Sequence, residues 1–589
     1  MNFILTLARK AIADLYGTHL GEDAVNLQET RKEFEGQVTV VTFPFTRFSK
    51  KSPEQTGEEI GEYLLKHSTD IAAYNVVKGF LNISLADGYW FELFRNHLLR
   101  DDFGHFPKNG QRVMVEYSSP NTNKPLHLGH VRNNLLGYAV AEILAAAGYE
   151  VIKSNLVNDR GIHICKSMLA WQKFGNGETP ESSGLKGDKL VGNYYVLFDK
   201  EYKKQVEALK QNGKSEEEAK REASLMQEAQ QMLRLWEAGD EATVALWNKM
   251  NAWVYAGFEE TYAKMGVTFD KIYYESNTYL LGKDLIQEGL DKGVFFKKED
   301  HSVWIDLTAE GLDQKLVLRG DGTSVYITQD LGTAQLKFDD YHMDQSIYVV
   351  GNEQDYHFKV LFLILEKLGK PWAKGLHHLS YGMVDLPSGK MKSREGTVVD
   401  ADDLIADMVS TAQNRTEELG KIDGFNEQEK NSLYEMIGLG ALKYFLLKVE
   451  PKKRLLFDPN ESIDFQGHTG PFIQYTHARI KSVLSKGAYS ADLLLEMPVQ
   501  LQNAERDLIK EIAKFPEILV AAARDYSPST IANYCYELAK LYNKFYHEVS
   551  ILKAEEEMVK YFRLHLSAVT AKVIARGMAL LGIAVPERM

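Results

Sequence analysis

The pattern that most constrains the fold lies at residues 112–157, where two short apolar segments flank a long amphipathic one. The apolar segments, 113–117 and 151–157, predict strands. The segment between them predicts a helix that ends at Gly148. Its apolar face comprises Val131, Leu135, Ala139 and Ile143. A strand, a helix and a strand in this length form a βαβ unit, so we expect an α/β fold with a parallel sheet.

The residues before this unit predict a separate, smaller part. Residues 1–105 alternate expected strands, at 38–45 and 79–85, with an expected helix at 54–67. A turn-rich linker follows at 106–110. This alternation is typical of a small α+β domain.

Two later segments are predicted to be helical. Lys, Glu, Gln and Ala dominate residues 185–265, so we expect a helical subdomain inserted into the sheet domain. Strands are expected to resume at 271–275, 324–328, 346–351 and 378–384. From about residue 427 the strands are expected to stop, and long amphipathic helices predict a bundle of about five helices. The three expected domains are 1–108, 109–426 with the insertion, and 427–589.

Composition places the chain among ordinary globular proteins. Hydrophobic residues make up 44 % and charged residues 26 % of its 589 residues. No apolar run approaches the roughly 18 residues of a membrane span, so no membrane partner is expected. The only cysteines, Cys165 and Cys535, are far apart in sequence, which argues against a disulfide framework or a cysteine zinc site and favours a reducing, cytoplasmic location. We expect a monomer without a permanent metal site.

The net charge of −13 bears on the choice of partner. Taken alone, it argues against nucleic acid. The argument is weak, because a large acidic protein can carry a local basic stripe. Bulk charge therefore leaves a nucleic-acid partner open.

The stretch from Glu116 to His130 lies between the first strand and the first long helix of the expected sheet. Ligands of open α/β sheets bind at such crossings, and a helix N-terminus suits a polyphosphate. Gly129 lets the backbone approach a nucleotide. His127 and His130 can donate hydrogen bonds to phosphate oxygens as charge builds up in a transition state. An isolated HxGH segment, however, is more often a capped helix with two surface histidines.

A basic loop at residues 390–397 follows the strand expected to end at 384. Pro387 and Gly389 predict that the loop is mobile. Lys390 on such a loop can reach the β- and γ-phosphates of a nucleotide and stabilise the departing pyrophosphate. A solvated basic turn is the usual alternative. A lysine loop about 260 residues after an HxGH segment nevertheless predicts that the two act together.

These two loops resemble the HIGH and KMSKS signatures of class I aminoacyl-tRNA synthetases, and the whole chain resembles the arginyl-tRNA synthetases among them. The segments that carry the narrower resemblance are 116–130, 158–161, 321–330, 467–479 and 580–589. The resemblance implies a Rossmann-like catalytic domain at 109–426. It also implies an N-terminal domain that touches the tRNA elbow and a C-terminal helical domain that binds the anticodon.

Three positions depart from the family pattern. Ser393 stands where many synthetases have the second lysine of KMSKS, and in this family the lysine before the HxGH, here Lys124, is thought to substitute for it. Arg160 replaces the usual tryptophan, and Gln329 replaces the usual arginine. Neither replacement removes a group that the chemistry needs.

The resemblance implies that ATP and L-arginine form an arginyl-adenylate, from which tRNA(Arg) accepts the arginyl group. Mg²⁺ is carried by the nucleotide, and family members commonly need bound tRNA before they activate arginine. The implied catalytic residues are His127, His130, Lys390 and Lys124. The implied ATP-binding residues are His127, Gly129, His130, Lys390 and Lys392. The resemblance places Glu116, Asn121, Tyr326, Asp330 and Gln354 around arginine, and tRNA contacts at Tyr475 and Met589.

The implied arginine residues suit a guanidinium, which presents five donors and keeps its charge. Asp330 or Glu116 can pair with it at charge-assisted strength. Asn121, Gln354 and Tyr326 supply neutral amides, a ring and a hydroxyl. Three of these residues also have a structural alternative. Asp330 could cap the following helix, Glu116 could pair with a local basic residue, and Tyr326 could belong to the core.

Residues 466–589 interleave aromatic and basic side chains, which suits unpaired RNA bases. Aromatic residues at helical spacing usually form core, so we expect most of these to pack. Two other functions remain open. A small-molecule nucleotidylyltransferase or ligase could use an HxGH site, but it would not need the helical C-terminal third. A non-catalytic RNA-binding relative would typically have lost the histidines or the loop lysine.

Overall fold

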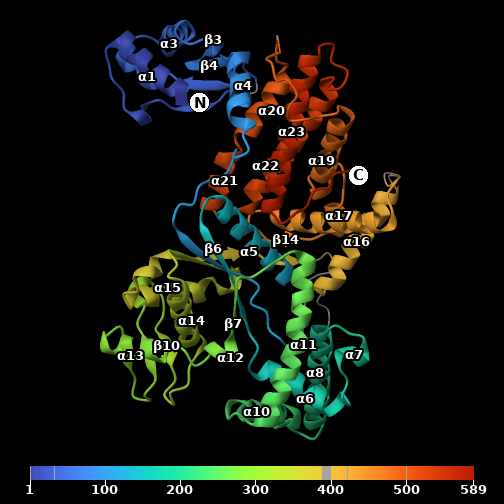
Figure 1. Cartoon of the computed structure of the whole chain (residues 1–589). Coiled ribbons are helices and arrows are strands. Elements are labelled where there is room, and N and C mark those ends of the chain that lie inside the picture. The colour runs from blue at the N-terminus through green and yellow to red at the C-terminus, as the bar shows by residue number, and fades with distance from the viewer. Residues whose placement is uncertain are drawn as a thin grey trace. The chain divides into compact units, whose positions relative to one another are not determined.

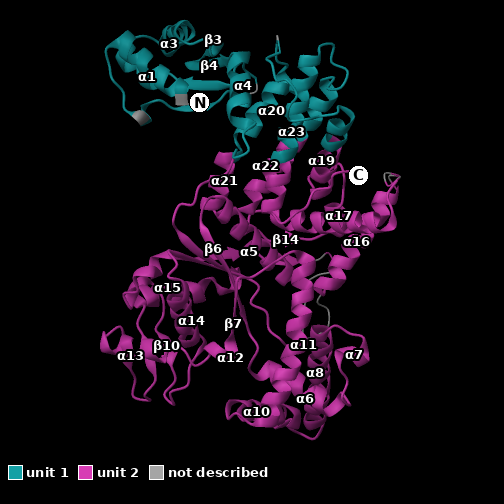
Figure 2. Ribbon diagram, in the orientation of Figure 1, with its two compact units in different colours: residues 1–103, 480–515, 540–573 teal, residues 104–479, 516–539, 574–589 magenta. Residues whose placement is uncertain are grey.

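The computed structural model describes all residues except Met1, Lys32, Leu386, 388–398, Leu419, Lys421, Asp423 and Val499. The chain divides into two compact units (Figure 2). The first comprises residues 1–103, 480–515 and 540–573, and the second comprises residues 104–479, 516–539 and 574–589. The domain borders expected from the sequence, after residues 108 and 426, remain a proposal.

A five-stranded sheet forms the centre of the second unit. Its order is β12-β11-β5-β6-β7, and all neighbouring strands in it are parallel. The strands are β5 (Arg112–Glu116), β6 (Glu150–Val157), β7 (Lys271–Tyr274), β11 (Gln345–Gly351) and β12 (Leu376–Tyr381). The expected α/β fold with a parallel sheet is therefore confirmed.

Helix α5 (Leu128–Ala146) connects β5 to β6 and packs against the sheet (Figure 1). Its predicted face is buried, at Val131, Leu135, Ala139 and Ile143. A Cβ at Gly137 would lie 2.4 Å from the side chain of Tyr117, so α5 and the residue after β5 approach closely. The N-terminus of α5 lies just beyond the carboxyl end of β5, at the edge of the sheet where ligands bind.

Residues 324–328, expected to form a strand, begin a helix instead. Helix α14 (Tyr326–Tyr341) starts here, because Oγ1 of Thr328 accepts a hydrogen bond from the N–H of Val325 at 3.0 Å and caps the first turn. Its buried face continues at helical spacing, at Ile327, Leu331 and Ala334. The β-branched residues favour a strand locally, but the cap and the longer apolar spacing decide the structure.

Two small sheets are absent from the sequence prediction. An antiparallel sheet contains β8 (Phe295–Lys297), β9 (Val303–Ile305) and β10 (Lys315–Leu318). In addition, β13 (Val384–Asp385) pairs in parallel with β14 (Leu455–Leu456). The expectation that strands stop at about residue 427 is therefore wrong. Strands of two to four residues are too short to show a period of two.

Residues 185–265 are helical, as expected. Their helices are α8 (Gly187–Gln211), α9 (Glu216–Glu222), α10 (Ser224–Glu237) and α11 (Glu241–Met265). Helices α8 and α11 pack so closely that a Cβ at Gly187 would lie 2.2 Å from the carbonyl oxygen of Trp253.

The first unit contains an antiparallel sheet with the order β1-β2-β4-β3. Its strands are β1 (Leu27–Glu29), β2 (Val38–Val41), β3 (Ile71–Val77) and β4 (Phe80–Leu85). Helix α3 (Pro53–His67) packs against this sheet, and α1 (Asn2–Tyr16) packs against α3. The expected α+β character of the N-terminal part is confirmed, although β2 is shorter than the strand expected at 38–45.

From residue 427 onward the chain is mainly helical, as expected. The helices are α17 (Glu427–Leu447), α18 (Pro459–Ser462), α19 (Gly470–Lys486), α20 (Asn503–Ala513), α21 (Phe515–Arg524), α22 (Pro528–Glu548) and α23 (Glu557–Leu580). Among the residues that the structure describes, no helix is both long enough and apolar enough to cross a membrane.

Candidate active site

The HxGH segment forms the N-terminal cap of α5. His127 is the cap residue, and its Nδ1 accepts a hydrogen bond from the N–H of Gly129 at 3.2 Å. The N–H of His127 donates to Nδ1 of His130 at 3.2 Å, and the two ring centroids lie 4.0 Å apart. Because both Nδ1 atoms accept, each neutral ring carries its proton on Nε2. The corner therefore offers two Nε2–H donors.

Both imidazoles are held in the neutral form. Burial, with a further contribution from Lys124, lowers the pKa of His127 to about 3. Burial, together with His127 and Lys124, lowers the pKa of His130 well below its usual value. The positive end of the α5 dipole lies at the same point. Two neutral N–H donors at a helix N-terminus suit the oxygen atoms of a polyphosphate.

Gly129 leaves room for the ring of His127. A Cβ at position 129 would lie 3.0 Å from Cε1 and 3.2 Å from Nδ1 of that imidazole. A larger residue would therefore force the ring to shift by a few tenths of an ångström. This reason is additional to the close approach of a nucleotide that the sequence predicts.

Arg132, two residues after His130, is a site residue that sequence reasoning did not identify. Its buried guanidinium donates at 2.7–3.3 Å to four carbonyl oxygens, those of Gly382, Met383, Pro451 and Lys453. Burial lowers its pKa to about 10, so the group stays charged at neutral pH. A charged residue on the otherwise apolar face of α5 was the signal that could have revealed it.

The residues after segment 388–398 are tied to the same corner. Backbone hydrogen bonds of 3.3 and 2.9 Å join residues 399–401 to residues 126–128. In this pairing His127 lies opposite Asp400. Two residues predicted to contact phosphates lie outside the described residues, Lys390 and Lys392.

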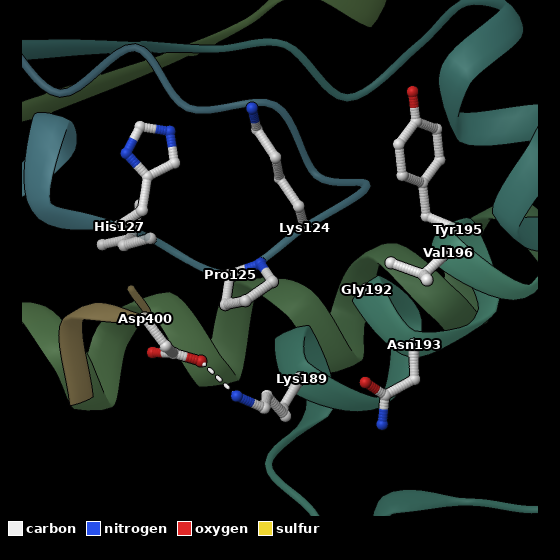
Figure 3. Close-up of a pocket in the computed structure, with 10 residues that line it drawn as sticks. Lys124, Pro125, His127, Lys189, Gly192, Asn193, Tyr195, Val196 and Asp400 are labelled. Atoms are coloured by element: carbon white, nitrogen blue, oxygen red, sulfur yellow. Dashed lines mark hydrogen bonds and ion pairs between the residues drawn. The ribbon is translucent and has the colours of Figure 1, made fainter. Parts of the chain in front are cut away.

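A cavity of about 140 Å³, the corner cavity, opens beside His127 (Figure 3). Lys124 and Pro125 line it together with residues of α8. Figure 3 shows the side chain of Lys124 beside the ring of His127. Lys124, predicted to replace the second lysine of the basic loop, thus lies next to the predicted phosphate site.

A second cavity, of about 370 Å³, brings together four of the five residues that the resemblance places around the amino acid. They are Glu116, Tyr326, Asp330 and Gln354. We call it the carboxylate cavity. Asn121 lines a further cavity, which Tyr326 also lines. Tyr326 is 79 % exposed, so the alternative that it belongs to the core is wrong.

The two carboxylates of this cavity have different partners. Glu116 is buried and forms an ion pair with buried Lys337 of α14, as its structural alternative required. The side chain of Asp330 is 37 % exposed, and its Oδ2 lies 2.6 Å from Nε2 of His357. Asp330 lies within α14 rather than at its cap, so the capping alternative is wrong. Asp330 is therefore the carboxylate better placed to meet a cationic ligand.

Sequence reasoning did not identify Lys337 or His357, although both line the carboxylate cavity. Lys337 follows Asp330 by seven residues, which places both on one face of α14. His357 follows Gln354 by three residues, in the first turn of α15 (Asp355–Lys367). Helical spacing from the predicted residues could therefore have revealed both.

The turn after β5 is held in a strained conformation. Ser118 and Ser119 have φ angles of 78° and 45°, which are uncommon for residues other than glycine. The N–H of Ser118 donates to Oδ1 of Asn133 at 2.6 Å, and the N–H of Ser119 donates to Oδ1 of Asn155 at 3.0 Å. Strain of this kind persists only where neighbours fix it. The backbone that carries Ser119 into the carboxylate cavity is thus preformed.

Arg160 and Gln329, the two residues that stand where the family usually has tryptophan and arginine, line the same cavity as Asn121. Arg160 forms an ion pair with Glu237 of α10 at 2.7 Å, and its guanidinium carbon lies 3.9 Å from the ring centroid of Tyr279. The arginine therefore links segment 158–161 to the helical insertion.

The predicted RNA-binding residues Tyr475 and Met589 belong to two segments that contact each other. The side chain of Gln474 donates to the carbonyl of Ala584 at 2.8 Å, and Nδ1 of His477 lies 2.9 Å from the carbonyl oxygen of Pro586. The C-terminal segment thus packs along α19. Most of the other interleaved aromatic residues pack, as expected, with Tyr534, Tyr542 and Phe545 buried.

Acidification is expected to destabilise the folded chain through His127. An unfolded histidine takes up a proton near pH 6.5, whereas folded His127 stays neutral down to a pKa of about 3. Because the unfolded state binds the proton first, stability is lost as the pH falls below about 6.5, by about 2 kcal/mol at pH 5. His127→Asn keeps a good N-cap and removes this titration. Urea unfolding at pH 7 and pH 5 should therefore show a smaller loss for the variant, and equal losses would contradict a buried neutral imidazole.

Two family models match the chain. The model described as "tRNA synthetases class I (R), catalytic domain" matches residues 95–458. The model described as "DALR anticodon binding domain" matches residues 473–589.

Similar proteins cover the full length of the chain. An arginine–tRNA ligase of Bacteroides thetaiotaomicron is 61 % identical over 580 residues, which are 98 % of this chain and 97 % of that protein. An arginine–tRNA ligase of Amoebophilus asiaticus is 60 % identical over 570 residues, 96 % of each chain. The solved structure of Thermus thermophilus arginyl-tRNA synthetase has the same fold, with a TM-score of 0.78 over 100 % of both chains at 24 % identity.

Proposed function

Because this chain belongs to the class I arginyl-tRNA synthetase family and has arginine–tRNA ligase activity, we propose that the His127–His130 corner and the carboxylate cavity are the two halves of its catalytic site. Their common position carries this proposal. Glu116 ends β5, His127 caps the helix that follows β5, and Gln354 follows β11. These residues lie at the carboxyl edge of one parallel sheet, where α/β proteins bind ligands.

In the proposed reaction, the carboxylate of L-arginine attacks the α-phosphate of ATP, which forms arginyl-adenylate and releases pyrophosphate. The 2′-hydroxyl of the terminal adenosine of tRNA(Arg) then attacks the arginyl carbonyl, and AMP leaves. Mg²⁺ enters with ATP as part of the substrate and bridges its phosphates. No protein nucleophile takes part, so catalysis depends on positioning and on charge stabilisation.

On the ATP side, we assign the Nε2–H groups of His127 and His130 to phosphate oxygens. The two backbone hydrogen bonds that fix their tautomers support this assignment. Lys390 and Lys392 are assigned to the phosphates of ATP, and Lys390 also to the departing pyrophosphate. The place of Lys124 beside His127 supports its role as the substitute lysine.

On the arginine side, we assign Asp330 as the partner of the guanidinium. Its partly exposed carboxylate supports this choice, whereas Glu116 is already paired with Lys337. Tyr326 covers the substrate, and Gln354 and Asn121 supply amide oxygens. A lysine substrate would leave several of these acceptors unpaired, which is how polar pockets reject analogues.

The remaining assignments concern tRNA and the setting of the reaction. We propose that Tyr475 and Met589 contact tRNA. Residues 1–108 would bind its elbow, and residues 427–589 would bind its anticodon. We also propose that arginine activation needs bound tRNA. The packing of the C-terminal segment on α19 supports the placement of Tyr475 and Met589. We further propose a monomer in the cytoplasm, a location that the buried free thiols of Cys165 and Cys535 support.

Bulk tRNA incubated with the protein, ATP and each amino acid in turn should become charged with arginine alone. This specificity is expected because the acceptors of the carboxylate cavity match a guanidinium. Charging is measured as radioactive amino acid that precipitates with tRNA in acid. Nucleotidyl transfer to a small molecule without any charging of tRNA would instead favour the nucleotidylyltransferase alternative.

A further inference from the structure

Helix α8 of the insertion contacts the His127–His130 corner through two separate segments. We propose that α8 is a positioning element for this corner and that Lys189 is its positioning residue. The inference rests on the proposed catalytic role of His127 and His130.

The first contact is an ion pair with the segment that lies beside His127. Nζ of Lys189 lies 2.9 Å from Oδ2 of Asp400 (Figure 3). It also lies 3.2 Å from Oδ2 of Asp403. The side chain of Asp400 is only 8 % exposed and that of Lys189 is 39 % exposed, so the carboxylate end of this pair is shielded from water. Because the backbone of Asp400 lies opposite His127, the ion pair fixes the segment against which the cap residue rests.

The second contact lies about one helical turn further along α8. A Cβ at Gly192 would lie 2.7 Å from Cδ of Pro125 and 3.5 Å from Cα of Lys124. Only glycine lets α8 lie directly against the segment that leads into His127. Helix α8 therefore supports His127 both through the preceding residues and through the segment paired with it.

The N-terminal end of α8 is itself anchored. Lys186 forms ion pairs with Asp402 and, at 3.2 Å, with Asp188. Lys264 of α11 lies 2.9 Å from the other carboxylate oxygen of Asp402. The side chain of Asp402 is 21 % exposed, and that of Asp188 is fully buried. These pairs join both long helices of the insertion to the start of α16 (Ala401–Glu418).

This arrangement predicts an effect on ATP chemistry without an effect on arginine binding. Residues of α8 line the corner cavity, whereas the carboxylate cavity is lined by other elements. A displacement of catalytic groups by about 1 Å can cost about 100-fold in rate. Loss of the ion pair should therefore lower the rate of adenylate formation and leave the KM for arginine unchanged.

The test compares Lys189→Met with Lys203→Met in the full-length protein, by ATP–pyrophosphate exchange with arginine and bulk tRNA present. Lys203 is a matched control, because it lies on the same helix and its Nζ forms an ion pair with Asp199, one turn earlier on α8, at 2.8 Å. Lys189→Met should lower kcat by about 10- to 100-fold with an unchanged KM for arginine. Lys203→Met should match the unaltered enzyme, and Lys189→Arg should restore most of the rate.

A second variant separates positioning from loss of charge. Gly192→Ala keeps every ion pair but forces a methyl group against Pro125, and it should lower kcat in the same way. Equal rates for Lys189→Met and Lys203→Met, or a rise in the KM for arginine that accounts for the whole loss, would overturn the inference. Failure of the unaltered protein to charge tRNA with arginine would instead overturn the proposed function.

Discussion

His130→Ala should slow the formation of arginyl-adenylate by about 100- to 1000-fold, as expected when one preorganised donor to a developing charge is removed. The donor is Nε2–H, which is available because Nδ1 of His130 accepts the N–H of His127 at 3.2 Å. The KM for arginine should change little, because His130 lies outside the set of residues that line the carboxylate cavity. ATP–pyrophosphate exchange in the presence of tRNA measures both quantities.

The alanine variant also removes part of the helix cap, so a second substitution is needed to separate structure from chemistry. His130→Asn offers an amide oxygen to the N–H of His127 but places no donor where Nε2 was. It should melt close to the unaltered protein and remain slow. His547→Ala, at an exposed position, is the control for the loss of an imidazole. A rate within threefold of normal for His130→Asn would remove this residue from the phosphate site.

The corner and the sheet around it could be predicted because their signals are local. The spacing of apolar residues at 112–157 predicts the βαβ unit directly. The three-residue separation of the two histidines places both on one helical turn. The strand expected at 324–328 shows the limit of the same reasoning. There the helix cap, in which the N–H of Val325 donates to Thr328, and the apolar spacing that continues along α14 together outweigh the strand preference of β-branched residues.

The partners of buried charges could not be predicted, because they come from distant parts of the chain. Glu116 meets Lys337, and Lys189 meets Asp400, only after the sheet and the insertion have formed. Nothing in the sequence near Arg132 indicates the four carbonyl groups that it binds. The sequence could therefore name two carboxylates as candidates for the guanidinium, but not say which one already had a partner.

Asp330→Asn is expected to lower kcat/KM for arginine by about 100- to 1000-fold, mainly through KM. The substitution removes the partly exposed carboxylate of the cavity but keeps an oxygen that can accept from His357. Truncating one member of a hydrogen-bonded charge pair at a binding site costs about 2–5 kcal/mol, or about 30- to 5000-fold, and the expected loss lies within this interval. Citrulline, which is neutral where arginine is charged, should compete better against arginine in the variant than in the unaltered enzyme.

Glu116→Gln provides the contrast, because its carboxylate neutralises Lys337. Burial lowers the pKa of that lysine, yet the ion pair with Glu116 leaves it above its usual value, so the buried ammonium stays charged. Removing Glu116 alone should cost about 3–5 kcal/mol of unfolding free energy, and Glu116→Gln with Lys337→Met should recover part of it. If instead Glu116→Gln raised the KM for arginine more than Asp330→Asn did while melting normally, the two carboxylates would have to exchange roles.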